Sequence, residues 1–167
     1  AITQKTGQVT FLGPMVGDFT RSPPNPQNAT NWEYLWRLLK GEPCTPAQAA
    51  RVLVAGEAEG KLVGGNLSIL ASECGTPTQL KTAGAILLLE ELSEDLYRFD
   101  RLLWQLKRAG LFDNLKGVVL ADLVGVADKG EPAFGQTVEE IVLSHVGQLG
   151  VPVVCDFPAG HGDGRVT

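Results

Sequence analysis

The sequence predicts an α/β fold with parallel strand pairs. The main observation is that, in the second half of the chain, short apolar runs alternate with segments whose apolar residues recur at helical spacing. A second observation is composition, since 20 glycines and an aromatic content of 7% suit a loop-rich α/β chain better than a helical bundle. The 167 residues fit one domain or a compact pair, and 44% apolar with 20% charged residues excludes disordered and fibrous proteins.

The first forty residues predict a strand, a loop and a helix. Residues 8–12 are rich in β-forming side chains and are followed by a Gly-Pro turn, which predicts a short strand. Residues 20–31 contain three prolines among polar residues and are expected to form a loop. A short helix is predicted over 32–39, with Asn31 as its N-cap and Gly41 at its end.

The next segment predicts a hairpin and a second short helix. Residues 51–55 and 61–63 are expected to be strands, and the five residues between them have the length of a hairpin connection. Residues 64–66 then form a predicted turn, in which Asn66 caps a helix that ends at Ser72. That turn could hold an anion on the helix N–H groups, but a hairpin exit with an N-cap is at least as good an interpretation.

The second half alternates strands and helices. Residues 85–89 are continuously apolar, as expected of a strand buried on both faces, and Glu90 and Glu91 end the run. The apolar positions of the next segment recur at helical spacing, which places them on one buried helix face: Leu96, Phe99, Leu103 and Leu106. The predicted elements are a helix over 94–109, a strand over 117–123, a polar loop over 127–136, a helix over 138–149 capped by Thr137, and a strand over 151–157.

Two residues follow predicted strands and are candidates for chemistry. Glu90 comes directly after one buried strand, and His161 lies between glycines just beyond another. Functional groups of parallel sheets gather at the carboxyl ends of strands, so these side chains could form a pair in which the carboxylate orients the imidazole. The alternatives are that Glu90 is a carboxylate at a helix N-terminus and that His161 is a solvated loop residue.

Other candidates are weaker. His145 falls on the apolar side of its predicted helix, which favours a buried structural role. None of the five serines lies in a nucleophile elbow; Ser68 comes nearest, but it falls in the first turn of a helix. Cys155 lies within a predicted strand, so a Cys–His pair is not expected.

A metal site is possible by residue type but not supported by spacing. The candidate ligands, which show no recognised metal-binding motif, are Glu90, Glu91, Asp156, His161 and Asp163. We therefore expect no metal and no other cofactor.

Charge and cysteine content exclude several classes of partner. The net charge of −5 argues against nucleic acid, and no apolar run approaches the ~20 residues of a membrane span. Three widely spaced cysteines indicate free thiols in a reducing compartment, and no secretory signal opens the chain, so a cytoplasmic location is expected. The chain starts at Ala1 without methionine and stops at Thr167 after a glycine-rich loop, so both ends are expected to be truncated.

Three motifs of the sequence are specific in combination: GGNL, LE-x₃-E-x₂-YR-x-DR, and FP-x-GHG. They lie within a longer series of segments: QVTFLGPM (8–15), GKLVGGNLSIL (60–70), GTP (75–77), AILLLEELSEDLYRFDRLLWQLKRAG (85–110), KGVVLADL (116–123) and GVPVVCDFPAGHG (150–162). In order and with similar spacing, these segments closely resemble the LD-carboxypeptidase family of serine peptidases, which includes muramoyl-tetrapeptide carboxypeptidases and microcin-immunity proteins.

The resemblance implies a Ser-Glu-His triad. Glu90 matches the family's triad glutamate and His161 its triad histidine. The serine of the family lies in an N-terminal domain, in a G-x-S-D turn, and that domain is absent from this chain. The resemblance also implies an interdomain connection with the first strand at 1–15 and a C-terminal catalytic domain at 16–167. The expected fold class is α/β, as a compact β/β/α domain with a mixed or parallel sheet.

The implied function is that of the C-terminal domain of a serine carboxypeptidase. The full-length protein would hydrolyse the L,D-peptide bond to a terminal D-alanine in murein tetrapeptides, in peptidoglycan recycling, and this chain alone would be inactive. Two alternatives are a microcin-immunity-type hydrolase of peptidyl-nucleotides and a non-catalytic α/β binding domain. The expected partners are the murein peptide and the protein's own N-terminal domain. A homodimer is a further candidate, since Trp32, Trp36 and Trp104 could serve a dimer or domain interface, although aromatic residues more commonly pack in the core.

Overall fold

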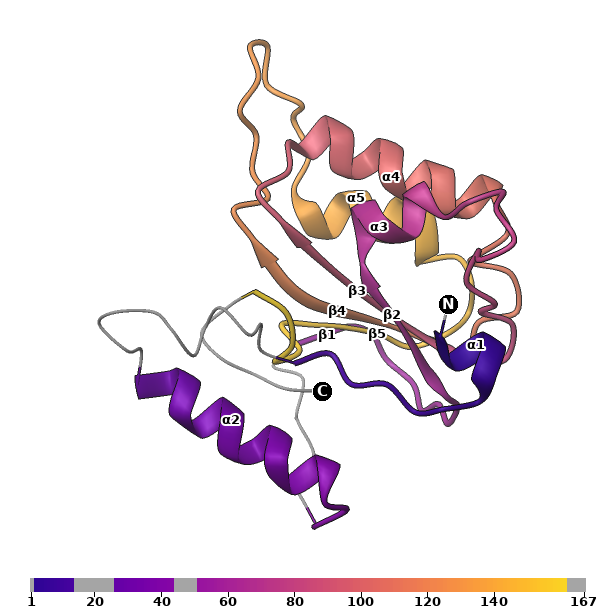
Figure 1. Cartoon of the computed structure of the whole chain (residues 1–167). Coiled ribbons are helices and arrows are strands. Elements are labelled where there is room, and N and C mark those ends of the chain that lie inside the picture. Colours follow the sequence, from indigo (N-terminus) through magenta and orange to yellow (C-terminus); the bar gives the residue numbers. More distant parts are fainter. Residues whose placement is uncertain (1, 14–25, 44–50, 162–167) are drawn as a thin grey trace.

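A five-stranded mixed sheet covered on one face by three helices forms the centre of the molecule (Figure 1). The structure is a computed structural model and describes residues 2–13, 26–43 and 51–161. The elements in chain order are α1 (Ile2–Thr6), α2 (Pro26–Leu39), β1 (Arg51–Val54), β2 (Leu62–Asn66), α3 (Leu67–Ser72), β3 (Ile86–Leu92), α4 (Leu96–Arg108), β4 (Gly117–Val124), α5 (Val138–Val146) and β5 (Val153–Cys155).

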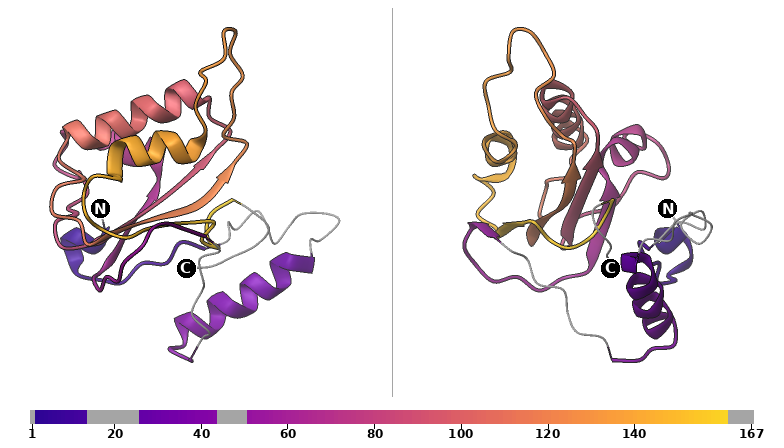
Figure 2. Two further views of the ribbon diagram at one scale, coloured as in Figure 1. Left: turned by 180° about the vertical axis from the view of Figure 1, so that it is seen from behind. Right: turned by 90° about the vertical axis from the view of Figure 1, so that its left-hand side faces the viewer.

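The sheet has the strand order β1-β5-β4-β3-β2. Strands β2, β3, β4 and β5 run parallel to one another, and the edge strand β1 is antiparallel to β5. The connecting helices α3, α4 and α5 all lie on the same face of the sheet, while α1 and α2 lie on the other side (Figure 2). The predicted α/β class is therefore confirmed, with a mixed sheet.

The main core lies between the sheet and its three helices. Leu87 and Leu89 of β3 belong to it, together with the predicted apolar face of α4. Those α4 side chains are all buried, as the helical spacing predicts: Leu96, Phe99, Leu103 and Leu106. A second, smaller cluster on the opposite face of the sheet contains Leu88, Ala121 and Ala159. Successive side chains of a strand point to opposite faces, so β3 contributes to both clusters alternately.

The predicted hairpin is wrong. β1 and β2 lie at opposite edges of the sheet, where β1 pairs with β5 and β2 pairs with β3. The length of the connecting segment fits a hairpin, but it does not determine which strand each run pairs with. Gly64 and Gly65, predicted to form a turn, lie within β2, and only Asn66 has its expected role, since its side chain accepts a hydrogen bond from the backbone N–H of Ile69.

The N-terminal predictions also need correction. Residues 7–13 are irregular, so the strand predicted over 8–12 is not formed, and a short helix precedes it. Helix α2 begins at Pro26 because proline is well tolerated at the first helical position. Asn31 is consequently inside the helix and buried, and does not cap it. Residues 20–25 of the predicted loop lie outside the described residues.

Three element ends differ from the predicted positions. β3 continues through Glu90 and Glu91 to Leu92, because both glutamates keep strand partners in the register. β5 is short because Asp156 adopts a left-handed conformation with φ of 54°. Helix α5 has the predicted Thr137 cap, as a capping box with Glu140, but it ends at Val146. Among the helices of the described ranges, none has both the length and the apolar character needed to cross a membrane.

Candidate active site

Glu90 is a buried carboxylate on the face of the sheet opposite the helices. Its side chain is only 2% exposed, although it lies near the end of β3. Leu88, two residues earlier, belongs to the cluster on that same face, so the two-residue period of the strand places Glu90 there as well. Its backbone is fixed on one side by β2, where it pairs in register with Asn66.

His161 lies directly against this carboxylate. The distance between His161 Nδ1 and Glu90 Oε2 is 3.0 Å, and the imidazole remains 43% exposed. An ionised carboxylate can only accept hydrogen bonds, so with Glu90 in that form Nδ1 would carry the proton and Nε2 would be left as the basic nitrogen. The arrangement can orient an imidazole and stabilise its protonated form.

The segment after β5 delivers His161 to this position. The N–H of Phe157 donates to the carbonyl of Leu120, and the N–H of Asp122 donates to the carbonyl of Ala159. Both bonds tie the segment to β4, and Ala159, within the segment, is fully buried. The histidine therefore projects from a segment that follows the sheet surface, although it lies beyond the last strand.

Gly160 allows the close approach. A Cβ atom at this position would lie 3.3 Å from Glu90 Cβ, 3.2 Å from Asp122 Cβ and 3.5 Å from Glu90 Oε2. The φ of Gly160 is 119°, a conformation that residues with a side chain rarely adopt. The sequence analysis noted the glycines beside His161, and the structure shows that the one before it lies between two acidic residues.

Asp122 lies beside the pair and was not predicted as a site residue. A bulge in β4 accounts for its position, because Leu89 pairs with Leu120 but Glu91 pairs with Leu123, which leaves one extra residue on β4. The same rule that singled out Glu90, a polar residue at the carboxyl end of an apolar strand, applies to Asp122 and could have identified it.

Glu91 is also buried, but its hydrogen bonds give it a structural role. Its carboxylate accepts hydrogen bonds from four donors: Asn66 Nδ2 at 3.0 Å, Ser68 N at 2.8 Å, Ser68 Oγ at 2.5 Å and Leu92 N at 2.9 Å. Burial alone would raise the pKa of Glu91, but the hydrogen bonds from Ser68, Leu92 and Asn66 outweigh it, and the pKa lies below its usual value. The sequence analysis considered Glu90 as a carboxylate at a helix N-terminus. In the structure Glu91 has such a position, at the start of α3.

The remaining sequence candidates lie away from the Glu90–His161 pair. His145 is buried, with Nε2 2.7 Å from Asp100 Oδ1 and its ring against Trp104. Its predicted structural role fits this position, although Nδ1 has no partner among the described residues. Cys155 lies in β5, as predicted, with its thiol near the Asp156 carboxylate.

The candidate metal ligands do not converge. Glu91 faces α3, and Asp156 is paired with Arg51, so neither faces the Glu90 carboxylate. Asp163 lies outside the described residues. Within those residues, no group of three or more His, Cys, Asp or Glu side chains is arranged to hold a metal ion. Of the tryptophans considered for an interface, Trp36 and Trp104 are exposed, whereas Trp32 is half-buried.

Comparison with known proteins places the chain in a family. The sequence profile of the LD-carboxypeptidase C-terminal domain matches residues 59–167. The probable murein peptide carboxypeptidase of Bacillus subtilis (strain 168) is 34% identical over 165 residues, which cover 96% of this chain and 50% of that protein.

Solved structures agree with this relationship. The muramoyltetrapeptide carboxypeptidase from Oxalobacter formigenes superimposes with a TM-score of 0.74 at 28% identity, covering 98% of this chain and 55% of that one. The microcin self-immunity protein MccF gives a TM-score of 0.72 at 21% identity, covering 93% of this chain and 54% of that one, and so shares the fold. The chain spans about half the length of the curated relatives that it matches. It belongs to the LD-carboxypeptidase family, and residues 59–167 correspond to that family's C-terminal domain.

Proposed function

We propose that Glu90 and His161 are two members of a Ser-Glu-His triad in a serine carboxypeptidase that removes the terminal D-alanine from murein tetrapeptides. The observation that carries the proposal is the 3.0 Å contact between His161 Nδ1 and the buried Glu90 carboxylate. A buried acid on one imidazole nitrogen, with the ring still accessible to a nucleophile, is the acid–base half of a hydrolytic triad.

The serine is proposed to come from an N-terminal domain that is not among these 167 residues. No serine that the structure describes hydrogen-bonds to His161: the hydroxyls of Ser68, Ser72 and Ser144 donate to Glu91 or to backbone carbonyls within their own helix turn, and no hydrogen bond joins Ser93 to the imidazole. The coverage of about half of the relatives' length is consistent with a further domain in this family.

The surface around Glu90 is suited to contact with such a domain. Leu92 and Val124 are neighbours in register at the ends of β3 and β4, and both are exposed. Leu92 follows Glu90 by two residues, so it lies on the same face of the sheet. We propose that these exposed apolar side chains, at the ends of β3 and β4, form part of the surface that a serine-bearing domain covers.

The proposed reaction proceeds through an acyl-enzyme. His161 Nε2 accepts the proton of the serine hydroxyl as the oxygen attacks the carbonyl carbon of the L,D-peptide bond. The protonated imidazole then donates that proton to the amine of the leaving D-alanine, and the C–N bond breaks. Water, deprotonated by the same nitrogen, hydrolyses the ester and restores the serine. Glu90 holds the ring orientation and offsets the positive charge throughout.

The relatives favour a murein peptide as the substrate. The Bacillus protein is named as a probable murein peptide carboxypeptidase and the Oxalobacter structure as a muramoyltetrapeptide carboxypeptidase. The similarity to MccF supports the fold alone, so a peptidyl-nucleotide substrate stays the alternative. We also propose a cytoplasmic location, because Cys74 and Cys155 are both free thiols, as is usual in a reducing compartment.

The test is an activity assay of the full-length parent protein. We expect release of free D-alanine from a tetrapeptide whose terminal bond is L,D. The diastereomer that ends in L-alanine, with an L,L-bond, should release no L-alanine. The isolated 167-residue chain should be inactive. If the parent protein binds the tetrapeptide but releases no D-alanine, the non-catalytic binding domain is the correct interpretation. Turnover by the isolated chain would show that its nucleophile lies within these residues.

A further inference from the structure

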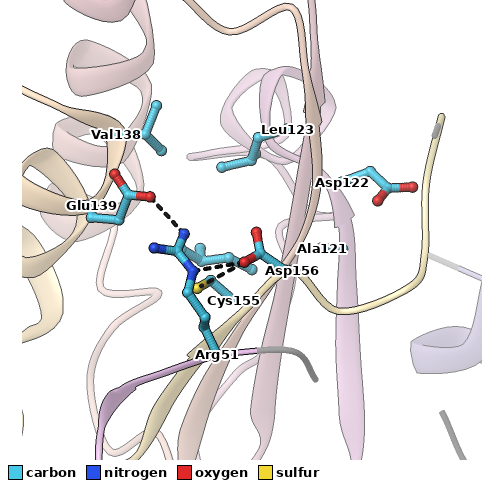
Figure 3. A pocket seen from close by; sticks show the side chains of 9 residues that line it. Arg51, Ala121, Asp122, Leu123, Val138, Glu139, Cys155 and Asp156 are labelled. Carbon is cyan, nitrogen blue, oxygen red and sulfur yellow. Dashed lines mark hydrogen bonds and ion pairs between the residues drawn. The ribbon is translucent and has the colours of Figure 1, made fainter. Parts of the chain in front are cut away.

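Arg51 joins three elements at the carboxyl ends of β4 and β5. Its Nη2 lies 2.7 Å from Glu139 Oε1, and its Nε lies 2.7 Å from Asp156 Oδ2 (Figure 3). Arg51 is the first residue of β1, Glu139 lies in the first turn of α5, and Asp156 is the first residue after β5. One guanidinium therefore links the edge strand, a helix and the start of the segment that leads to His161.

Asp156 is the point at which the chain leaves the sheet. Its φ of 54° is left-handed, a conformation that few residues other than glycine, asparagine and aspartate adopt, and it turns the chain sharply. The pairing of β1 with β5 sets Arg51 opposite Cys155, directly before Asp156. The strand register thus places the guanidinium where it can hold the carboxylate of this residue in one orientation.

Between Asp156 and the histidine, the segment is held by its contacts with β4 and by the burial of Ala159. Two backbone hydrogen bonds to β4, described above, hold its middle part. Gly160 then passes between Glu90 and Asp122 with contacts of 3.2–3.5 Å for a Cβ, so a small change in the course of the segment would displace the imidazole from Glu90. The direction in which the chain enters this narrow passage is set at Asp156.

The same charges argue against a substrate-binding role for Arg51. The cavity of about 270 Å³ that it borders is also lined by Asp122, Glu139 and Asp156, so the guanidinium charge is already balanced by its two carboxylate partners. The hydrogen bond from Arg51 is the main reason why the pKa of Glu139 is lowered, so Glu139 is ionised at neutral pH. A substrate carboxylate would have to displace an existing partner.

We propose that Arg51 is a positioning residue: by holding Asp156 it sets the course of residues 156–161 and so keeps the His161 imidazole aligned on Glu90. Isolated surface ion pairs add little stability, so the expected consequence concerns orientation more than folding. The effect on hydrolysis rests on the proposed function, but the effect on the orientation of His161 does not.

The orientation can be measured in the 167-residue chain without any substrate. The chain contains only two histidines, so imidazole ¹⁵N spectra at pH 8 give two sets of signals, assigned with the His161→Ala variant. We expect His161 to be mainly the Nδ1–H tautomer in the parent sequence. In Arg51→Ala the ratio of Nδ1–H to Nε2–H should fall at least threefold, while His145, held by Asp100, stays unchanged and reports an intact fold.

Three further variants separate the contact of Arg51 with Asp156 from its contact with Glu139. Asp156→Asn keeps a residue that tolerates the left-handed conformation but removes the ion pair, and should reproduce the effect of Arg51→Ala. Glu139→Gln removes only the contact with α5 and should leave the His161 tautomer ratio near the parent value. Arg51→Lys, which retains the charge without the planar fork, should give a ratio between those of the parent and the alanine variant.

In the full-length protein, Arg51→Ala and Asp156→Asn should each lower kcat about tenfold with KM unchanged, because misplacement of a catalytic group slows the chemical step. The proposal is overturned if both variants keep the parent tautomer ratio and kcat. It is also overturned if Glu139→Gln changes the His161 ratio as much as Asp156→Asn does. If the full-length protein is inactive before any substitution, the proposed function fails, and the tautomer ratio still decides the role of Arg51.

Discussion

Glu90 and Glu91 are consecutive residues of β3, but their carboxylates lie on opposite faces of the sheet. Glu90 contacts His161 on the face away from the helices, whereas Glu91 accepts hydrogen bonds from the first turn of α3. The alternation of a strand thus gives two buried acids of the same type two different environments. Substitution of the first should affect the reaction, and substitution of the second should affect the stability of the fold.

Glu90→Gln should abolish most of the activity of the full-length protein. Glutamine has nearly the same size, but it has no charge to offset the protonated His161, and its amide group does not enforce the Nδ1–H tautomer. We expect kcat/KM for D-alanine release to fall by about 10³–10⁴-fold, with little change in melting temperature. Glu57→Gln, in the exposed connection between β1 and β2, is the matched control. Activity of Glu90→Gln within tenfold of the parent would remove Glu90 from the proposed triad.

Glu91→Gln should destabilise the chain without a direct effect on His161. In the variant an amide NH2 group replaces one carboxylate oxygen. At least one of the donors from Asn66, Ser68 and Leu92 then lacks an acceptor in a buried position. We expect a loss of about 2–3 kcal/mol in the free energy of unfolding at pH 7, measured by urea denaturation. A loss below about 0.5 kcal/mol would contradict the structural role.

The pH dependence of that loss follows from the lowered pKa of Glu91. Hydrogen bonds to the ionised form hold its pKa in the folded state below the unfolded-state value of about 4.3. The stabilisation is therefore complete above that unfolded-state value and is lost as the pH falls through the lower folded-state pKa. The difference between the parent and Glu91→Gln should be constant from pH 5.5 to 7.5 and should shrink below pH 4.

The elements that sequence patterns predict well are those fixed by local periodicity. The strand at 85–89 and the helix at 94–109 are found within a few residues of their expected ends, because each is specified by its own apolar spacing. The closeness of Glu90 and His161 was predictable for a related reason, since Glu90 lies near the carboxyl end of β3, His161 lies beyond that of β5, and the ends of parallel strands meet at one edge of a sheet.

Pairing between distant segments could not be predicted in this way. The apolar runs that became β1 and β2 have the spacing of a hairpin, and only the complete sheet shows that they are its two edges. Arg51 and Asp156 are 105 residues apart, and their ion pair depends on the antiparallel pairing of β1 with β5. The end of an apolar strand marks Asp122 as a candidate, but the bulge in β4 that sets its register is not indicated by any local pattern in the sequence.

Gly160→Ala should impair the reaction more than the fold. The added Cβ would press against Glu90 and Asp122 and would occupy a backbone conformation with φ of 119°. The segment must shift to relieve these contacts, and the shift moves His161 away from Glu90. We expect kcat of the full-length protein to fall by 10–100-fold, which the D-alanine assay would measure. Gly130→Ala, in the polar loop before α5, is the control, because a Cβ there meets only ordinary contacts. Equal activity of the two variants would contradict the close passage of residue 160.

Gly64→Ala should strongly destabilise the sheet, and the neighbouring Gly65 provides an unusually well-matched control. Both residues lie in β2 with similar backbone angles, φ of 145° and 139°. A Cβ at position 64 would lie 1.9 Å from the carbonyl oxygen of Leu88, whereas a Cβ at position 65 has no atom within 4 Å. The obstructing atoms belong to the backbone of β3, so they cannot rotate away, and β2 would have to separate from β3 two residues before Glu90. We therefore expect Gly64→Ala to cost about 3 kcal/mol or more, and Gly65→Ala to cost only the backbone strain of about 1–2 kcal/mol. Urea denaturation of both variants measures the difference, and equal losses would show that strain, and not the contact with Leu88, requires glycine at position 64.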